Sequence, residues 1–166
     1  MQLFSLDESK RISELSAGMK VKFSLALALS HSADLLILDE PTSGLAPVSR
    51  DEILDIFISL SQDEGKPVFC STHITSDLAR CADNIIYLKQ GRIAENEPLC
   101  TLLQKYSVVQ FSADNAPKNI ELFGARREND CMSARARNSE LPAGVESAPA
   151  GLEDIIVHIE REGETK

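Results

Sequence analysis

The first residues that could do chemistry are the carboxylate pair Asp39-Glu40, which follows the apolar run Leu-Leu-Ile-Leu at 35–38. Such a run is typical of a buried parallel strand, and open α/β sheets bind ligands beyond the carboxyl ends of their strands. There Asp39 could hold Mg²⁺ directly or through water, since Mg²⁺ prefers one or two carboxylates plus phosphate oxygens. Glu40 could orient or deprotonate a water molecule. A solvated acidic turn explains the pair equally well.

Two further stretches could contribute to a site. Ser16 is a good helix N-cap, and the first-turn N–H groups, with Gly18 allowing close approach, would form an anion site. An ordinary capped helix is the alternative. His73 follows a predicted strand in the sequence Ser-Thr-His-Ile. A single histidine at such a place is more often a structural hydrogen-bonding group than a catalytic one.

The elements that must position these residues alternate between strands and helices. This order predicts an α/β fold with a parallel sheet covered on both faces. The helix at 16–31 has apolar residues around nearly its whole circumference, which predicts burial on most sides. The other predicted helices are 47–62, 76–81 and 98–105, and the predicted strands are 35–38, 68–70, 84–89, 92–95 and 107–111, with a hairpin turn at Gln90-Gly91.

The last third of the chain differs in composition. Residues 112–151 are charged, polar and punctuated by proline and glycine, which predicts a long loop or partly disordered linker. Apolar residues then recur at helical spacing from Leu152 to Ile159, predicting a short amphipathic helix. We therefore expect a first domain at 1–111, a linker at 112–151, and a helix with its tail at 152–166.

Composition excludes several classes of protein. Of the 166 residues, 43% are hydrophobic and 26% are charged, as in an ordinary globular chain. The longest stretch without a charged residue, 23–33, is too short to cross a bilayer, and acidic residues at 7 and 8 argue against a signal peptide. A net charge of −9 argues against a nucleic-acid partner. The four cysteines form no C-x-x-C pair, so reduced cytosolic thiols are expected.

The order and spacing of these residues resemble a known family. Ser16, Asp39 and His73 are 23 and 34 residues apart, and Pro-Thr-Ser-Gly-Leu-Ala follows the acidic pair at 41–46. This resembles the C-terminal half of an ATP-binding cassette (ABC) ATPase, a P-loop NTPase-like α/β fold, over roughly residues 3–105. Residues 15–19 look like the signature motif, 35–40 like Walker B and 43–46 like the D-loop, and His73 looks like the switch histidine.

The resemblance implies roles for these residues. Family members form head-to-tail dimers that hold ATP and Mg²⁺ between two protomers. Ser16, Ala17 and Gly18 would then contact a γ-phosphate held by the partner, and Asp39 would serve Mg²⁺. Glu40 would be the general base, and His73 would touch the γ-phosphate in its own protomer.

The sequence context looks most like the separate ATPase subunits of bacterial exporters. Such subunits pair with a distinct membrane permease and hydrolyse ATP to drive transport. The resemblance therefore implies a cytoplasmic location, peripheral on the inner face of the cell membrane, without insertion into it.

Three departures from the family pattern matter. No stretch matches the phosphate loop G-x-x-x-x-G-K-[ST] (Walker A); Gly65-Lys66 comes nearest, but Leu60 and Pro67 do not fit. The signature has Ala17 and Met19 where the family usually has glycine and glutamine. The D-loop ends in Ala46 where the family usually has Asp, which puts communication between protomers in doubt.

These departures predict a chain that cannot hold ATP unaided and is inactive alone, whether as a truncated gene, a split subunit or a partial frame. In P-loop ATPases the strand that leads into Walker A lies centrally, next to the strand that ends at the switch histidine. Without that strand, the strands at 68–72 and 84–89 would lack a shared neighbour and expose unpaired edges, so we expect low stability or aggregation. Two alternatives remain. One is a non-catalytic module that regulates a permease or an intact ATPase. The other is a soluble ABC ATPase of DNA repair or translation, which the acidic charge and the lack of coiled-coil heptads disfavour.

Overall fold

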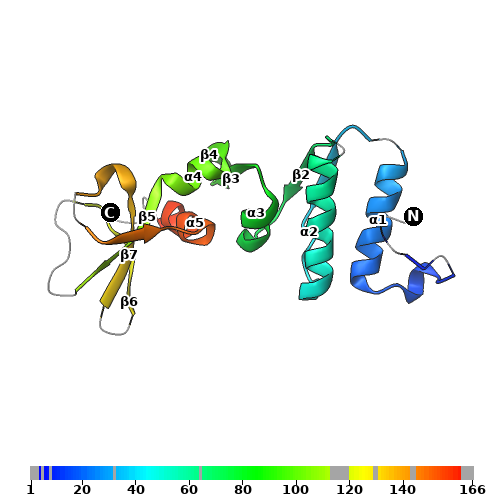
Figure 1. Ribbon diagram of the computed structural model, residues 1–166, viewed down its shortest axis with the longest axis horizontal. Coiled ribbons are helices and arrows are strands. Elements are labelled where there is room, and N and C mark those ends of the chain that lie inside the picture. The colour runs from blue at the N-terminus through cyan, green and yellow to red at the C-terminus, as the bar shows by residue number, and fades with distance from the viewer. Residues whose placement is uncertain are drawn as a thin grey trace. The chain divides into compact units, whose positions relative to one another are not determined.

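The chain folds into two compact units, Met1–Cys81 and Ala82–Lys166 (Figure 1). They are seen in a computed structural model that describes residues 4, 6–7, 9–31, 33–63, 65–112, 120–128, 131–142 and 145–161. Each unit has its own sheets and helices.

The N-terminal unit contains two long helices and a pair of parallel strands. The helix and strand predictions for this unit are confirmed, with boundaries that move by at most a few residues. Pro47 opens the second long helix at its first position, where a missing N–H costs nothing. The elements are a 3-10 helix Ile12–Glu14, α1 Ala17–Ser30, β1 Leu36–Asp39, α2 Pro47–Gln62, β2 Val68–Ser71 and α3 Thr75–Cys81.

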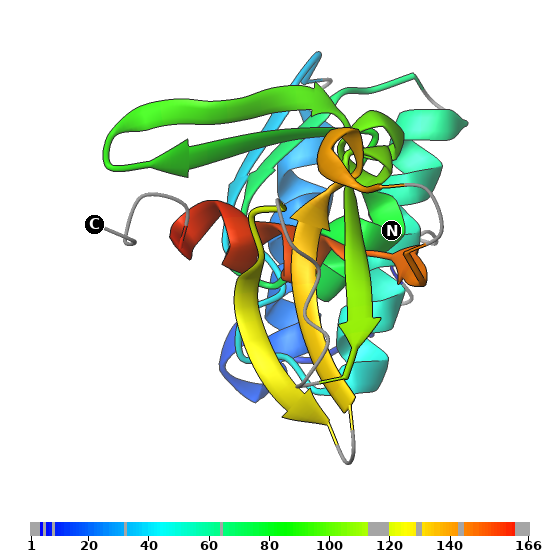
Figure 2. The same cartoon turned by 90° about the vertical axis from the view of Figure 1, so that its left-hand side faces the viewer.

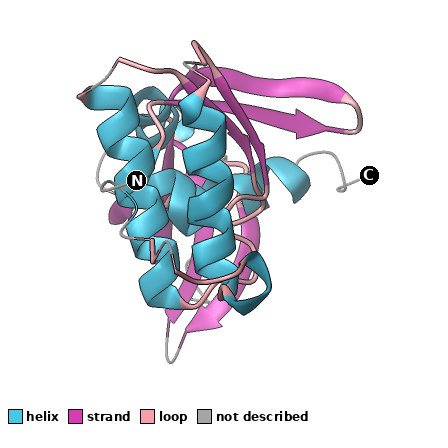
Figure 3. Ribbon diagram, turned by 90° about the vertical axis from the view of Figure 1, so that its right-hand side faces the viewer, coloured by secondary structure: helices cyan, strands magenta, loops and turns pink. Residues whose placement is uncertain are grey.

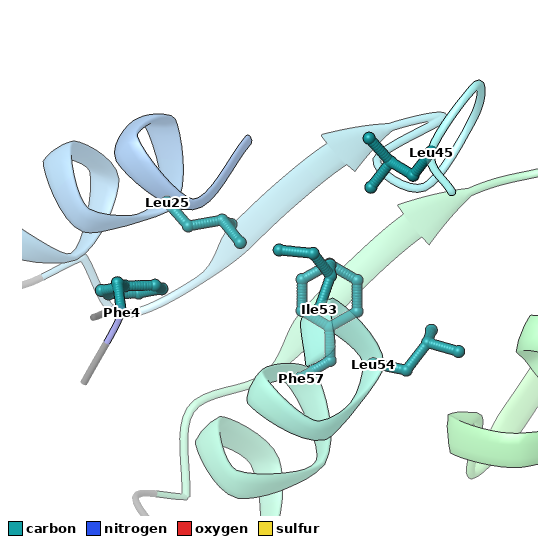
Figure 4. Packing of buried hydrophobic residues seen from close by; sticks show 6 residues of the cluster. All are labelled: Phe4, Leu25, Leu45, Ile53, Leu54 and Phe57. Atoms are coloured by element: carbon teal, nitrogen blue, oxygen red, sulfur yellow. The ribbon is translucent and has the colours of Figure 1, made fainter. Parts of the chain in front are cut away.

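The core of this unit lies between the helices and one face of the strands. Figure 3 shows α1 and α2 side by side, and Figure 4 shows the buried side chains of this core from close by. Leu38 of β1 and Val68 of β2 pack against this cluster from the strands. The buried members of the cluster are Phe4, Leu25, Leu45, Ile53, Leu54 and Phe57.

Within the N-terminal unit, the two-stranded sheet is covered on one face only, and not on both as predicted. β1 pairs with β2 in parallel, and Leu36 faces the interior at 3% exposure. On the opposite face Ile37 is 72% exposed and Phe69 is 53% exposed. Successive side chains of a strand point to opposite faces, so this second face has no cover among the described residues of the N-terminal unit. We call the surface formed by Leu35, Ile37 and Phe69 the outer sheet face.

The prediction that the first helix is buried on most sides was also wrong. Only Gly18 and Leu25 of α1 are buried, and Leu27 is 47% exposed. The reason is that α1 packs mainly against α2, which can cover one side of a helix and not its whole circumference.

The C-terminal unit contains a hairpin and a four-stranded antiparallel sheet (Figure 2). The hairpin, the helix after it, the next strand and the final helix were predicted correctly. The sheet has the strand order β6-β7-β5-β8. The elements are β3 Asn84–Lys89, β4 Arg92–Pro98, α4 Leu99–Gln104, β5 Tyr106–Phe111, β6 Phe123–Glu128, β7 Cys131–Arg137, a 3-10 helix Asn138–Glu140, β8 Ser147–Pro149 and α5 Leu152–Arg161.

The predicted loop at 112–151 was wrong for the residues that form β6, β7 and β8. In β7 the buried residues Ala134 and Ala136 alternate with Arg135 and Arg137, so the buried face is made of small residues that carry a weak apolar signal. Residues 132–137 of β7 pair with residues 106–111 of β5, and both strands belong to the unit Ala82–Lys166. Residues 113–119, 129–130 and 143–144 of the predicted loop, and 162–166 of the predicted tail, lie outside the described residues.

Helix α5 completes the C-terminal unit by covering the sheet. Its buried side chains include Ile155 and His158, and the His158 ring lies 4.8 Å from the Tyr106 ring and 4.2 Å from the Phe123 ring, between centroids. Arg135 of β7 donates to Asp154 of α5 at 2.9 Å and 2.5 Å. None of the described helices is both long enough and apolar enough to cross a membrane.

Candidate functional site

Parallel pairing of β1 with β2 brings two of the predicted segments together. Both strands end at the same edge, so Asp39 lies opposite Ser71, and the chain continues into Glu40 on one side and His73 on the other. The Ser71 hydroxyl donates to Asp39 Oδ1 at 2.5 Å, and the Glu40 backbone N–H donates to the Ser71 carbonyl at 2.9 Å. The site therefore begins as an extension of the strand ladder.

The Glu40 carboxylate is held by three donors from the segment after β2. The His73 backbone N–H lies 3.1 Å and His73 Nδ1 lies 2.8 Å from Oε1, while the Thr72 hydroxyl lies 3.2 Å from Oε2. The hydrogen bond from the His73 side chain is the main cause that lowers the pKa of Glu40, against a smaller opposing effect of desolvation. Glu40 is therefore a carboxylate at neutral pH, able to accept a proton.

The backbone at Glu40 is in the left-handed region, with φ at +46°. This region is unusual for a residue with a side chain and marks local strain. The turn that follows repeats the conformation at Gly44, where φ is +70°. Hydrogen bonds from Ser43 N–H to the Glu40 carbonyl, at 3.1 Å, and from Leu45 N–H to the Thr42 carbonyl, at 3.3 Å, hold the turn.

The predicted anion-binding segment forms the start of α1. Ser16 is the N-cap, with its hydroxyl accepting from Met19 N–H at 3.3 Å, and Ser16 and Ala17 are exposed. Gly18 is buried, and a Cβ there would lie 2.7 Å from Ser49 Oγ of α2. Gly18 therefore allows the close packing of α1 on α2, a role that the sequence interpretation missed.

The structure thus joins some of the predicted site residues and not others. Hydrogen bonds connect Asp39, Glu40 and His73 into one cluster through Ser71 and Thr72. Among the described residues, the first turn of α1 shares no hydrogen bond with that cluster. Sequence reasoning also missed Ser71 and Thr72 as partners, although their position directly after a predicted strand was a usable signal.

The donor set at Asp39 fits Mg²⁺. An exposed carboxylate and a neighbouring hydroxyl are hard oxygen ligands of the kind that Mg²⁺ accepts. Within the part of the chain that the structure describes, no three His, Cys, Asp or Glu side chains gather tightly enough to enclose a metal ion. Such a site suits an ion that takes its remaining ligands from phosphate and water.

Comparisons with known proteins agree with this geometry. Residues 7–76 match the family model described as "AAA domain, putative AbiEii toxin, Type IV TA system". The chain is 46% identical over 156 residues to ABC transporter G family member 23 of Dictyostelium discoideum, covering 90% of this chain and 22% of that protein. It is 34% identical over 168 residues to Nod factor export ATP-binding protein I of Neorhizobium galegae, covering 90% of this chain and 48% of that protein. The chain therefore spans less than half the length of these curated relatives.

A solved structure carries the same fold. The chain is similar to the dimeric, post-hydrolysis ATP-binding cassette MJ0796 bound to ADP and Pi, with a TM-score of 0.52 and 27% identity. The match covers 59% of this chain and 43% of that one. The predicted α/β, P-loop NTPase-like fold is confirmed by this likeness. These likenesses in sequence and structure support the interpretation of the chain as a fragment of an ATP-binding cassette ATPase.

Proposed function

We propose that the chain is part of the ATP-hydrolysing subunit of an ABC transporter of the exporter type. The observation that supports this proposal most is the Glu40–His73 contact, because it places a charged base beside a histidine at the carboxyl ends of adjacent parallel strands. This is the edge at which α/β sheets bind nucleotides.

Each residue of the cluster has a chemical task in this proposal. Glu40, kept ionised by its hydrogen bonds, accepts a proton from the attacking water. His73 touches the γ-phosphate and in the present arrangement orients the Glu40 carboxylate. Asp39, with the Ser71 hydroxyl, would hold the Mg²⁺ that neutralises charge on the phosphates.

The first turn of α1 acts on a nucleotide held by another protomer. Ser16, Ala17 and the free N–H groups of the turn would face the γ-phosphate in a head-to-tail dimer. Gly18 would act indirectly, by allowing α1 to pack closely against α2. The similar cassette MJ0796 is dimeric in its post-hydrolysis state, which supports this part of the proposal.

The phosphate loop is the missing part of the site. Because no G-x-x-x-x-G-K-[ST] stretch occurs in the sequence, we propose that polypeptide other than these 166 residues supplies it. Partners would be a membrane permease and a second ATPase protomer, on the cytoplasmic side of the cell membrane. The similarity to a Nod factor export protein favours export as the direction of transport.

The test is ATP hydrolysis by the native polypeptide that carries this sequence. Glu40→Gln keeps the shape of the side chain and removes the base, so we expect the rate to fall by about 10²- to 10⁴-fold. Glu121→Gln, at an exposed position in the other unit, is the matched control and should keep the wild-type rate. Equal rates for wild type and Glu40→Gln would contradict the proposal.

A second experiment separates the chain from its partners. The 166-residue chain by itself should not turn over ATP, since it has no phosphate loop. Turnover by the purified chain that Glu40→Gln abolishes would contradict this expectation.

A non-catalytic interaction module is the second candidate, and the outer sheet face favours it. Ile37 and Phe69 are exposed apolar residues that another polypeptide could cover. This candidate predicts that added chain changes the ATPase rate of an intact cassette, and that Glu40→Gln chain changes it equally.

A further inference from the structure

Asp77 of α3 is a buried carboxylate with no role in the proposed mechanism. It is 4% exposed, and its closest partner, Thr42, is 1% exposed. The Thr42 hydroxyl donates to Asp77 Oδ2 at 2.6 Å. Burying a carboxylate is costly unless it is paired or hydrogen-bonded, so these partners must satisfy it in the folded state.

Three elements converge on this carboxylate. Thr42 comes from the turn after β1, Arg50 Nε of α2 lies 3.9 Å from Asp77 Oδ2, and Ser76 Oγ of α3 lies 3.5 Å from Oδ1. The backbone N–H of Asp77 donates to the Ile74 carbonyl at 3.1 Å, which fixes the start of α3. The carboxylate therefore ties α3 to the turn by a short hydrogen bond and faces α2 through a longer ionic contact with Arg50.

The two ends of this tie lie next to the candidate site. Thr42 is two residues after Glu40, and Asp77 is four residues after His73. Two more hydrogen bonds connect these segments. Ile74 N–H donates to Thr72 Oγ1 at 3.1 Å, and the Thr72 hydroxyl donates to Glu40 Oε2. A displacement of the turn relative to α3 would thus be transmitted to the Glu40–His73 contact.

We propose that Asp77, through Thr42 and Arg50, is a positioning residue that holds Glu40 and His73 at hydrogen-bonding distance. The geometric part of this inference stands on the contacts alone. Its consequence for ATP hydrolysis rests on the proposed function.

The first experiment measures hydrogen exchange of the His73 backbone amide by NMR in the 166-residue chain. Thr42→Val removes the hydroxyl donor at nearly constant volume, and Thr42→Ser keeps it. In wild type this amide donates to Glu40 Oε1 at 3.1 Å. We expect Thr42→Val to lower the protection of the amide against exchange, and Thr42→Ser to keep the wild-type protection.

A purely structural role for Asp77 predicts a different result. It would lower the protection of the α2 core amides together with that of the His73 amide, because both would exchange through the same global unfolding. A folded Thr42→Val chain in which the His73 amide keeps its wild-type protection, or loses only as much as the α2 amides do, overturns the proposal.

Asp77→Asn is the second variant, used also if Thr42→Val does not fold. It keeps an oxygen that can accept from Thr42 and removes the charge that faces Arg50. We expect Asp77→Asn to lower the protection of the His73 amide as well. In the double variant the two effects should not add, because both substitutions break the same tie. Additive effects, or no effect of Asp77→Asn, overturn the proposal.

The kinetic experiment uses the native polypeptide. There Thr42→Val should lower kcat by about 10- to 100-fold with KM for ATP nearly unchanged, as expected when a supporting group is lost. Thr42→Ser should keep kcat. If the wild-type polypeptide does not hydrolyse ATP, the proposed function fails, while the hydrogen-exchange experiment still decides whether Asp77 positions the pair.

Discussion

At the scale of single residues, packing and hydrogen bonding determine what each residue of the proposed site can do. Glu40 has a strained backbone and three donors on its carboxylate, so its orientation is set by its neighbours and not by its own preference. Gly18 sits in the segment that the sequence assigned to a phosphate, yet it is buried against Ser49. Close packing of α1 on α2 therefore explains why this position holds a glycine.

Gly18→Ala provides the test of that explanation. Alanine favours a helix over glycine by about 1 kcal/mol. The added Cβ, however, would lie 2.7 Å from Ser49 Oγ and 2.8 Å from Ser49 Cβ, and such overpacking costs about 1–3 kcal/mol. We expect a net loss of stability, measured by urea denaturation, and its partial recovery in Gly18→Ala/Ser49→Gly. A Gly18→Ala chain more stable than wild type would show that the two helices have room to spare.

At the scale of elements, α5 holds the C-terminal unit together. Its Ile155 is fully buried against the sheet, while Glu153 on the same helix is exposed. Ile155→Ala should destabilise the unit by about 2–5 kcal/mol, and Glu153→Ala by less than about 0.5 kcal/mol. Hydrogen exchange of the β5 and β7 amides would measure both. Equal protection in the two variants would mean that the sheet does not depend on α5.

The β3–β4 hairpin is joined to α5 by a hydrogen bond from the Tyr87 hydroxyl to Glu160, and the Tyr87 hydroxyl loses its proton at alkaline pH. Burial and the hydrogen bond to Glu160 raise the pKa of Tyr87 to about 12, above the ordinary value of about 10. The folded state therefore holds the Tyr87 proton more tightly than the unfolded state does. The resulting stabilisation is complete below about pH 10 and is lost as pH rises towards about 12.

Tyr87→Phe should remove this part of the alkaline loss. Urea midpoints measured at about pH 9 and about pH 11 should differ less in Tyr87→Phe than in wild type. A smaller loss of the same sign should persist, because the hydrogen bond to Glu97 raises the pKa of Lys105. An identical alkaline loss in both proteins would mean that Tyr87 titrates normally.

At the scale of the whole molecule, the outer sheet face is the surface that we expect to cause self-association. Parallel sheets are usually covered on both faces, yet Ile37 and Phe69 are exposed, and β1 and β2 form a sheet of only two strands. We expect the 166-residue chain to self-associate as its concentration rises, which sedimentation velocity would detect.

Replacing the apolar side chains of this face should reduce the association. Ile37→Ser/Phe69→Ser should shift the chain towards monomer. Val48→Ser is the matched control, because Val48 is 73% exposed but lies at the start of α2 and outside the outer sheet face. A wild-type chain that stays monomeric, or a Val48→Ser variant that dissociates equally, would contradict the prediction.

The sequence by itself determined much of the local structure and the position of three candidate site residues at the ends of strands. Helix α2 was predicted with its observed ends because Pro47 and a regular apolar stripe are local signals. Asp39, Glu40 and His73 could be assigned to strand ends in the same way, because each follows closely on an apolar run.

The tertiary structure decided what depends on residues far apart in the chain. Strand β7 was missed because its buried residues are the small Ser133, Ala134 and Ala136 and because it pairs with β5, which is distant in the sequence. The contact of Gly18 with Ser49 joins residues 31 positions apart, and that of Thr42 with Asp77 joins residues 35 positions apart. Periodicity and capping report only on neighbours within a few residues. Which side chains meet across the fold, and which face of a sheet remains uncovered, follows from packing alone.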